Sequence, residues 1–382
     1  MIICMYYKKM NNDEVLLIEK IKSKIKYFPE IRGYDNVEEK GSCYYNNANI
    51  VPLSNNNFIY FDQQNICRIY NSNFDILLHL TPIKEGNKFL FSPYCENVIY
   101  PLSNGHFFSG GFFSSILEIS NDYQSYKVIQ KLEEKSALDI IELKNNILII
   151  FCHPNKIIIY EKNKSNDLYE KNIMLSNKII ERKENKIKKL FNNSDKNSFG
   201  IIYDNFIDIY SIKDNLIEFS KQIKLSDEKL KFTKYFLLLN ETTLIINCYK
   251  DEVEEYEKNL EEIEVPGNFE EFFNYNKNQY KGIAIVNLNF NEIISIVETK
   301  SIIHGLVKYD NTYFVVLEEE KKDKYNSIIK LNAWKYEEEK EIKYITTLEE
   351  KEKNLEEFQS FENAISKLSD GTIIYTLAYL KQ

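Results

Sequence analysis

The sequence predicts an all-β protein, a seven-bladed β-propeller whose blades are four-stranded antiparallel sheets. One recurring sequence pattern supports this prediction: a hydrophobic stretch, a polar turn, and a second stretch rich in Ile, Phe and Tyr. Its copies begin at Leu53, Leu102, Leu143, Leu190, Leu239, Val307 and Leu368. Four of the six spacings lie between 41 and 49 residues, which matches the roughly 40 to 50 residues of a propeller blade.

Most copies of the pattern are followed by two further short hydrophobic stretches. Each repeat is therefore expected to contain four strands, which we call a to d. Turns built from Asn, Asp, Ser and Lys separate these stretches, as expected between short antiparallel strands. The additional strand pairs are expected in residues 66–80, 114–132, 156–175 and 206–225. We therefore treat residues 1–382 as a single propeller domain.

The two ends of the chain are expected to share the last blade. The seventh copy supplies only two strands before the sequence ends, whereas residues 1–26 have the pattern of strands c and d. Alternating lysines in this segment are typical of an exposed edge strand: Lys20, Lys22, Lys24 and Lys26. We expect residues 1–26 to complete the blade formed by residues 361–382, with residues 2–7 beside residues 372–380. This pairing would close the ring and remove open sheet edges.

The predicted third strands of four repeats end in an aliphatic residue followed by an aromatic one: Ile69-Tyr70, Ile159-Tyr160, Ile209-Tyr210 and Ala333-Trp334. The pattern resembles that of WD40-like propellers, in which strand c ends in an aliphatic residue followed by Trp-Asp. Here Tyr mostly replaces Trp, and no Asp follows. The family's Gly-His pair precedes strand a, whereas Gly105-His106 lies in a predicted a–b turn. The resemblance therefore implies the architecture and no particular activity.

Two insertions account for the two long spacings. The first covers residues 250–281 between strands b and c of the fifth blade, and the second, EEEKKDKYN from Glu318, occupies the same position in the sixth. In WD40-like propellers the b–c and d–a loops lie on one face, where residues 27–46, 178–186 and 349–360 would join them. Long loops in compact domains are often functional, so we expect the function on this face.

The fifth-blade insertion is acidic and then aromatic. Between residues 251 and 271, ten Asp and Glu side chains are opposed only by Lys258, a formal charge of −9 that equals the −9 of the whole chain. This patch can attract a basic partner, or it is a solvated charge run. The aromatic side chains can anchor a partner or pack against the propeller, a common fate of large aromatics. The candidate partner-binding residues are Glu254, Glu255, Glu257, Phe269, Phe272, Phe273 and Tyr275.

No catalytic, metal-binding or cofactor-binding constellation is evident. The histidines, His79, His106, His153 and His304, lack metal-ligand spacing and nearby orienting carboxylates, and the six cysteines include no C-x-x-C pair. We expect six free thiols. Polar residues expected in strand a of the blades do not define a catalytic pair, because a one-residue change of register reverses every side chain: Asp139, Glu142, Lys188, Lys234, His304 and Ser366.

These observations favour a non-enzymatic scaffold that binds a protein partner through loops on one face. The alternative is a divergent propeller hydrolase or isomerase with a site at the mouth of the central channel. We expect no cofactor, no nucleic acid because the pI is about 5.3, and no membrane span because long apolar runs are missing. The start of the sequence lacks a secretory pattern, so we expect a cytoplasmic location. The one basic tract, Lys178–Lys189, is either a solvated loop or a contact for a phosphate or for the acidic insertion of a neighbouring copy.

Overall fold

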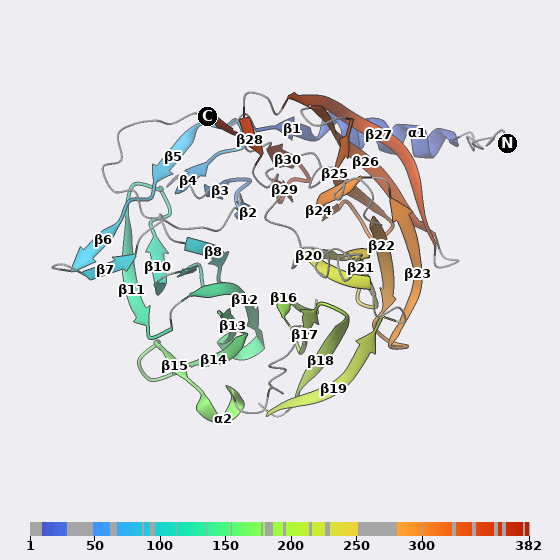
Figure 1. Ribbon diagram of the computed structural model, residues 1–382. Helices are drawn as coiled ribbons and strands as arrows, with labels where there is room; N and C mark the ends of the chain where they lie inside the picture. The colour runs from blue at the N-terminus through green and yellow to red at the C-terminus, as the bar shows by residue number, and fades with distance from the viewer. Residues whose placement is uncertain are drawn as a thin grey trace, which may run out of the picture.

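Figure 1 shows the computed structural model, in which seven β-sheets are arranged as blades around a ring. The prediction of a seven-bladed propeller is confirmed. The structure describes residues 10–28, 49–61, 67–85, 88–91, 96–111, 113–134, 136–153, 155–176, 179, 186–193, 196–213, 216–225, 230–250, 281–299, 301–322, 326–337, 341–354, 358–360, 364–376 and 379–381.

The first three blades are four-stranded antiparallel sheets. Blade one contains β2 (Asn49–Pro52), β3 (Phe58–Phe61), β4 (Cys67–Tyr70) and β5 (Ile76–His79). Blade two contains β8 (Glu96–Pro101), β9 (Phe107–Gly111), β10 (Ser114–Ile119) and β11 (Tyr126–Leu132), after a separate hairpin of β6 (Ile83–Glu85) and β7 (Lys88–Phe91). Blade three contains β12 (Ala137–Leu143), the 3₁₀ helix η2 (Lys144–Asn146), β13 (Ile147–Cys152), β14 (Lys156–Lys162) and β15 (Tyr169–Lys171), and is followed by the short helix α2 (Ile173–Ser176).

The next three blades have the same strand order. Blade four contains β16 (Ile187–Asn192), β17 (Ser198–Tyr203), β18 (Phe206–Lys213) and β19 (Leu216–Lys224). Blade five contains β20 (Leu230–Leu238), β21 (Thr243–Lys250), β22 (Lys281–Asn287) and β23 (Glu292–Thr299). Blade six contains β24 (Ile302–Lys308), β25 (Tyr313–Lys321), β26 (Asn326–Glu337) and β27 (Glu341–Asn354).

Blade seven joins the two ends of the chain. Its described strands are β29 (Ala364–Lys367), β30 (Ile373–Thr376) and β1 (Ile25–Tyr27), in the order β1-β30-β29. A separate pair, β28 (Phe358–Ser360) and β31 (Tyr379–Lys381), extends the hairpin of this blade. The N-terminal and C-terminal segments thus share one sheet, as the sequence predicts.

In four repeats, those of Leu53, Leu102, Leu239 and Leu368, the recurring pattern forms an a–b turn closed by a backbone hydrogen bond, and the leucine is buried. The amide of Leu53 donates to the carbonyl of Asn57 at 2.8 Å, and the same bond joins Leu368 to Thr372 at 2.8 Å. Both leucines are buried. In three of these turns the residue three positions after the leucine is left-handed, a conformation that favours Asn and Gly: Asn56 has φ 57°, Gly105 has φ 85° and Gly371 has φ 86°.

Seven hydrophobic clusters fill the interfaces between neighbouring blades. Each strand near the axis is therefore covered on both faces, which suits continuous apolar runs better than alternation. All six residues of β13 are buried, as are all four of β3. Since each cluster combines side chains from two blades, a blade gains most of its apolar burial only when both neighbours are in place.

The closing strand differs from the prediction in its position and direction. Residues 12–23, expected to contribute to strands c and d, form the helix α1 (Asn12–Ser23), so Lys20 and Lys22 lie on a helix, whereas Lys26 lies in β1, the outer strand of the described sheet. A capping box between Asn11 and Glu14 starts this helix. The strand that closes the ring is β1, which runs parallel to β30, whereas the other described strand pairs are antiparallel. Residues 2–7 lie outside the described residues.

Helix α1 packs between blades six and seven, on the outer side of the ring beside β27 (Figure 1). Ile18 and Ile21 are 4% and 0% exposed, in a cluster with Leu317 of blade six and Ile373 of blade seven. Glu14 also pairs with Lys335 of β26 at 2.7 Å. The helix therefore attaches the N-terminal segment to both blades. Among the described residues, no helix has the length and apolarity needed to cross a membrane.

The two predicted insertions differ in the structure. In blade six, Glu318 to Lys321 belong to β25, and residues 349–354 belong to β27, so both segments are strand and not loop. They pair fully with β26, which explains why the acidic residues there are compatible with a sheet. In blade five, β21 ends at Lys250 and β22 begins at Lys281, and residues 251–280 lie outside the described residues.

Two substitutions on α1 test whether this helix holds the ring closed. Ile21→Ala should lower the free energy of unfolding by about 2–5 kcal/mol, because it leaves a cavity at the blade six–seven interface. Leu16→Ala, at a side chain that is 65% exposed, should change it by less than about 0.5 kcal/mol. Urea unfolding followed by circular dichroism measures both, and equal effects would contradict the packing of α1.

Candidate functional site

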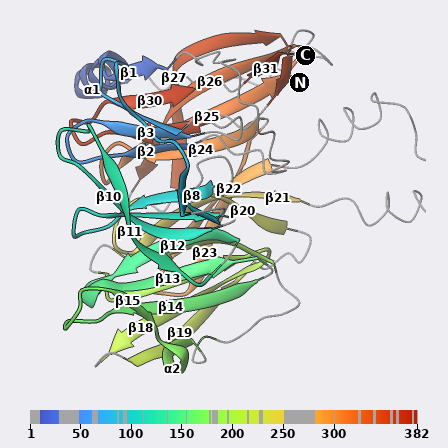
Figure 2. The same ribbon diagram turned by 90° about the vertical axis from the view of Figure 1, so that its left-hand side faces the viewer.

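The insertion of blade five leaves from one face of the ring. Strand pairing places Leu230 opposite Lys250, and Lys281 opposite both Tyr249 and Thr299. These residues mark the end of the blade at which the b–c and d–a connections lie, and we call this side the b–c face. In the side view of Figure 2, β21 and β31 extend toward it. All the candidate partner-binding residues, Glu254, Glu255, Glu257, Phe269, Phe272, Phe273 and Tyr275, lie outside the described residues.

A buried carboxylate lies near this face in blade six. Glu318 of β25 is 4% exposed, and its Oε1 accepts a hydrogen bond from Nε1 of Trp334 at 3.2 Å. Burial raises the pKa of Glu318, although hydrogen bonds from Asn332, Trp334 and Ser301 act in the opposite direction. A carboxyl group with three donors around it is held in place by the fold, and Glu318 therefore serves to fix the only tryptophan of the chain.

His304 has an orienting carboxylate that the sequence did not reveal. Its Nε2 lies 2.7 Å from Oε2 of Glu319, and the two side chains are 12% and 4% exposed. We expected no such partner, because Glu319 is on the other strand of the a–b hairpin and the pairing shifts between Ile303 and Gly305. At Gly305 the blades approach closely, since a Cβ there would lie 2.4 Å from Ile365 of blade seven. A bulge beside a tight blade contact thus sets the position of the His304–Glu319 pair.

The other polar residues of the innermost strands mainly connect neighbouring blades. Asp139 accepts hydrogen bonds from Nζ of Lys189 and from the amide of Leu190 in blade four, both at 2.7 Å. Glu142, 1% exposed, accepts from the amide and hydroxyl of Ser103 in blade two, each at 2.8 Å. These carboxylates are neutralised or hydrogen-bonded within the frame, a structural arrangement.

The remaining polar candidates from the innermost strands make separate local contacts. Lys188 pairs with Asp204 at 2.5 Å, and Nζ of Lys234 lies 5.4 Å from the ring centroid of Tyr235. Ser366 pairs in register with Ile374 within blade seven. The structure therefore does not bring the six polar candidates together into one site. Within the described ranges, no three His, Cys, Asp or Glu side chains gather as metal ligands.

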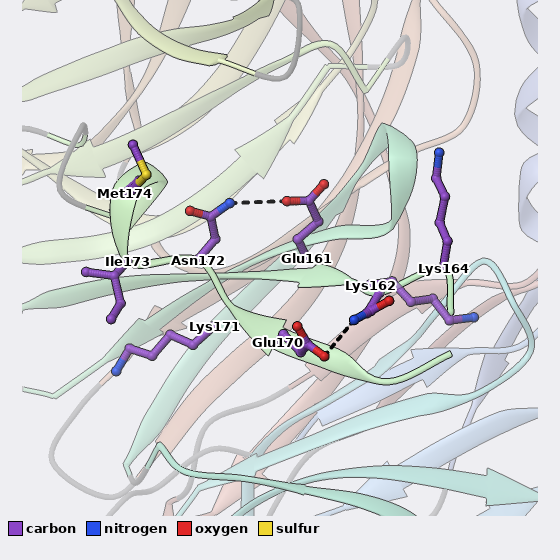
Figure 3. Close-up of a pocket in the computed structure, with 9 residues that line it drawn as sticks. Glu161, Lys162, Lys164, Glu170, Lys171, Asn172, Ile173 and Met174 are labelled. Atoms are coloured by element: carbon purple, nitrogen blue, oxygen red, sulfur yellow. Dashed lines mark hydrogen bonds between the residues drawn. The ribbon is translucent and has the colours of Figure 1, made fainter. Parts of the chain in front are cut away.

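A hollow of about 530 Å³ lies on the outer rim of blade three (Figure 3). We call it the rim hollow, and it is lined by Glu161, Lys162, Asn163, Lys164, Glu170, Lys171, Asn172, Ile173 and Met174. Two hydrogen bonds organise its walls: Asn172 donates to Glu161 at 3.1 Å, and Asn163 donates to Glu170 at 2.8 Å.

The sequence did not predict the rim hollow, because residues 156–175 were interpreted as two strands. Strand d of this blade, β15, is only three residues long, and the chain then turns into α2. A signal for this turn was present, since Asn172 precedes an apolar triplet and Asn favours helix starts. The consequence is an exposed apolar pair, Ile173 at 63% and Met174 at 80% exposure.

Comparison with known proteins supports the fold and no specific activity. No family model matches the chain, and no curated protein matches it. Among solved structures, that of U3-55K is 10% identical over 85% of each chain, with a TM-score of 0.51. The WD40 repeats of RRP9 are 10% identical, with 85% of this chain and 84% of that chain covered and a TM-score of 0.50. The C-terminal WD40 domain of Sif2 is 12% identical, with 87% and 79% covered and a TM-score of 0.50.

The fold is that of a WD40-like, seven-bladed β-propeller. These similarities confirm the architecture that the Ile-Tyr and Ala-Trp pairs suggested. Because the identities are 12% or less, they establish the fold alone.

The raised pKa of Glu318 gives a test of its buried position. A carboxyl whose pKa is higher in the folded state favours folding when protonated, so the free energy of unfolding should fall as pH rises from the ordinary carboxyl pKa to the raised one. Glu318→Gln keeps an oxygen for Trp334 and removes this titration. Its stability relative to the natural chain should therefore increase across that pH window.

Urea unfolding at a series of pH values, followed by the fluorescence of Trp334, measures this difference. Glu352→Gln, at an exposed position of β27, is the matched control for the removal of one carboxylate. If the curves for Glu318→Gln and the natural chain ran parallel, burial would not raise the pKa of Glu318 in the folded protein.

Proposed function

We propose that this protein is a non-enzymatic scaffold that binds a protein partner through the b–c face. The partner-binding residues in this proposal are Glu254, Glu255, Glu257, Phe269, Phe272, Phe273 and Tyr275. The supporting observation is how blade five accommodates the insertion. Strands β21 and β22 pair in unbroken register from Thr243 opposite Asn287 to Tyr249 opposite Lys281. The sheet is complete without residues 251–280, which fits a segment added for recognition.

A rigid frame supports this role energetically. Buried contacts such as Glu142 with Ser103 and Asp139 with Leu190 join consecutive blades. Ordering of the frame thus occurs during folding, and binding has to order only the loops of the b–c face. A protein surface with positive charge is the partner that best complements the segment from 251 to 271, because opposite charges steer encounter.

The alternative, a hydrolase or isomerase at the channel mouth, requires convergent catalytic groups. In the part of the chain that the structure describes, Asp139 and Glu142 face separate donors, and Glu318 and Glu319 contact Trp334 and His304 respectively. These arrangements favour structural roles. The described cysteines Cys152 and Cys248 are free thiols and buried, in line with the cytoplasmic location that we propose.

Replacing residues 251–280 by a short Gly-Ser turn tests the proposed function. Folding stability should change little, because the length of a surface loop contributes weakly to the free energy of unfolding. Proteins captured from the source cell by the full chain should be lost, and a purified partner should bind the replaced chain more weakly. A chain carrying Glu350→Gln and Glu352→Gln on β27 controls for loss of negative charge elsewhere.

Kinetic measurements with that purified partner separate the two parts of the insertion. Neutralising Glu254, Glu255 and Glu257 should slow association and flatten its salt dependence, whereas truncating Phe272 and Phe273 should speed dissociation. If the replaced chain unfolds, the aromatic residues belong to the core of the propeller. If it folds and retains every partner, the binding surface lies elsewhere.

A further inference from the structure

We propose that Arg68 and His79 of blade one form a site for an oxyanion, a phosphate or a carboxylate group. The two residues lie on β4 and β5, the outer strands of this blade (Figure 1). This site goes beyond the proposed function, because it needs neither the insertion of blade five nor a protein partner. It gives a ligand class to a charged side chain that the frame itself does not use.

The strand pairing brings Arg68 and His79 to the same face of the sheet. Arg68 pairs with Tyr60 of β3 on one side and with His79 of β5 on the other. Side chains directly opposite each other in antiparallel strands share a face, with Cβ atoms about 4.5–5.5 Å apart. Tyr60 packs in one cluster with Phe28 of the N-terminal segment and Ile374 of blade seven, so this face is turned toward blade seven.

Both residues lie at the end of their strands that borders the b–c face. Strand β3 ends at Phe61 and β4 begins at Cys67, so the b–c connection of blade one comes just before Arg68. His79 is the last residue of β5, and the chain leaves the blade on the same side. Arg68 is partly buried and His79 is exposed, so an ion reaches the pair from solvent past the imidazole.

Arg68 is the charged member among the shielded polar groups. Of the buried side-chain atoms that lack a hydrogen-bond partner within the described residues, all except Nε of Arg68 belong to neutral groups. Nor does an ion pair join Arg68 to a carboxylate in the described part of the chain. A guanidinium remains charged in proteins, and removing a charge from water without a partner is unfavourable. An oxyanion at the accessible nitrogens of the guanidinium offsets this loss of hydration.

The charge at this position is positive and uncompensated. Burial and the positive charge of Arg68 both lower the pKa of His79, and no described carboxylate acts in the opposite direction. The planar guanidinium matches the oxygens of phosphate and carboxylate groups, and the imidazole adds an N–H donor. In the rim hollow, by contrast, two lysines pair with carboxylates: Lys162 with Asp167, and Lys171 with Glu134.

Proton NMR of the histidine C2–H resonances, followed as a function of pH, tests this site in the full chain. His79→Gln assigns the resonance of His79. At equal ionic strength, inorganic phosphate in place of chloride should raise the pKa of His79, because a bound anion favours the imidazolium form. His106, which lies at the a–b turn of blade two, is the internal control and should titrate alike in both salts.

Two substitutions test whether Arg68 holds the anion. Arg68→Gln should raise the pKa of His79 in chloride, since it removes a positive charge, and should weaken phosphate binding by about tenfold or more. Arg68→Lys keeps the charge and lacks the planar fork, so it should weaken phosphate binding while the pKa of His79 in chloride stays low. Lys224→Gln, at an exposed position of β19, is the matched control and should bind phosphate as the natural chain does.

Two further probes distinguish the source of the oxyanion. N-acetyl-phosphoserine amide represents a phosphate carried by a larger molecule, and acetate represents a carboxylate. A pKa of His79 that is unchanged by phosphate, by the phosphoserine derivative and by acetate would overturn the inference. So would a response to phosphate in Arg68→Gln as large as in the natural chain. Replacement of residues 251–280 should leave the phosphate response intact, so this site and the proposed function succeed or fail separately.

Discussion

The parallel pairing of β1 with β30 is the constraint on which the whole ring depends. Three residues, Ile25 to Tyr27, form the strand that brings the two ends of the described chain into one sheet. The pairing continues at both ends, since Ile373 donates to the carbonyl of Lys24 at 2.9 Å and Phe28 donates to that of Tyr375 at 2.8 Å. So short a strand contributes few hydrogen bonds, and the flanking side chains must supply most of the stability.

Those side chains act at both interfaces of blade seven. On one side Ile18 and Ile21 of α1 pack against blades six and seven. On the other, the ring of Phe28 lies 5.4 Å from Phe58 and 5.0 Å from Tyr70 of blade one, edge to face in both cases. Aromatic contacts of this kind add to the burial of their area. The N-terminal segment therefore stabilises two interfaces at once, and every other blade benefits because its own interfaces require a closed ring.

The functional consequence is that the blades provide a rigid frame, whereas recognition is left to segments added to it. Glu142 and Asp139, which were candidates for a channel site, connect neighbouring blades instead. Removing one member of such a buried pair typically lowers the free energy of unfolding by about 3–5 kcal/mol. The exposed apolar pair of the rim hollow and the insertion of blade five are additions to a frame that is already complete. Recognition can change in such additions while the frame is unaffected.

The sequence was sufficient to predict the ring of seven blades. It was insufficient to predict which strand closes the ring and which side chains come together in its sites. The pattern of a hydrophobic stretch, a polar turn and a second hydrophobic stretch recurs seven times, so seven blades are visible in the chain alone. The apolar residues near Ile18 fit helix and strand patterns equally, although Asn11 and Glu14 gave a capping signal. The His304–Glu319 pair depends on a bulge, and the rim hollow depends on where β15 ends. The first is set by tertiary pairing, which no local pattern encodes, whereas Asn172 gave a local signal for the helix start beside the rim hollow.

Amide hydrogen exchange tests the closure of the ring most directly. The account predicts that the amides of Phe28 and Ile373, which bridge the two ends of the chain, exchange as slowly as those of the inner strands of other blades, such as Ile149 in β13. All of these amides should open only with the global unfolding of the ring. If the peptide containing residues 24–28 exchanged at the rate of an unstructured chain while β13 stayed protected, the ring would not be closed by its N-terminal segment.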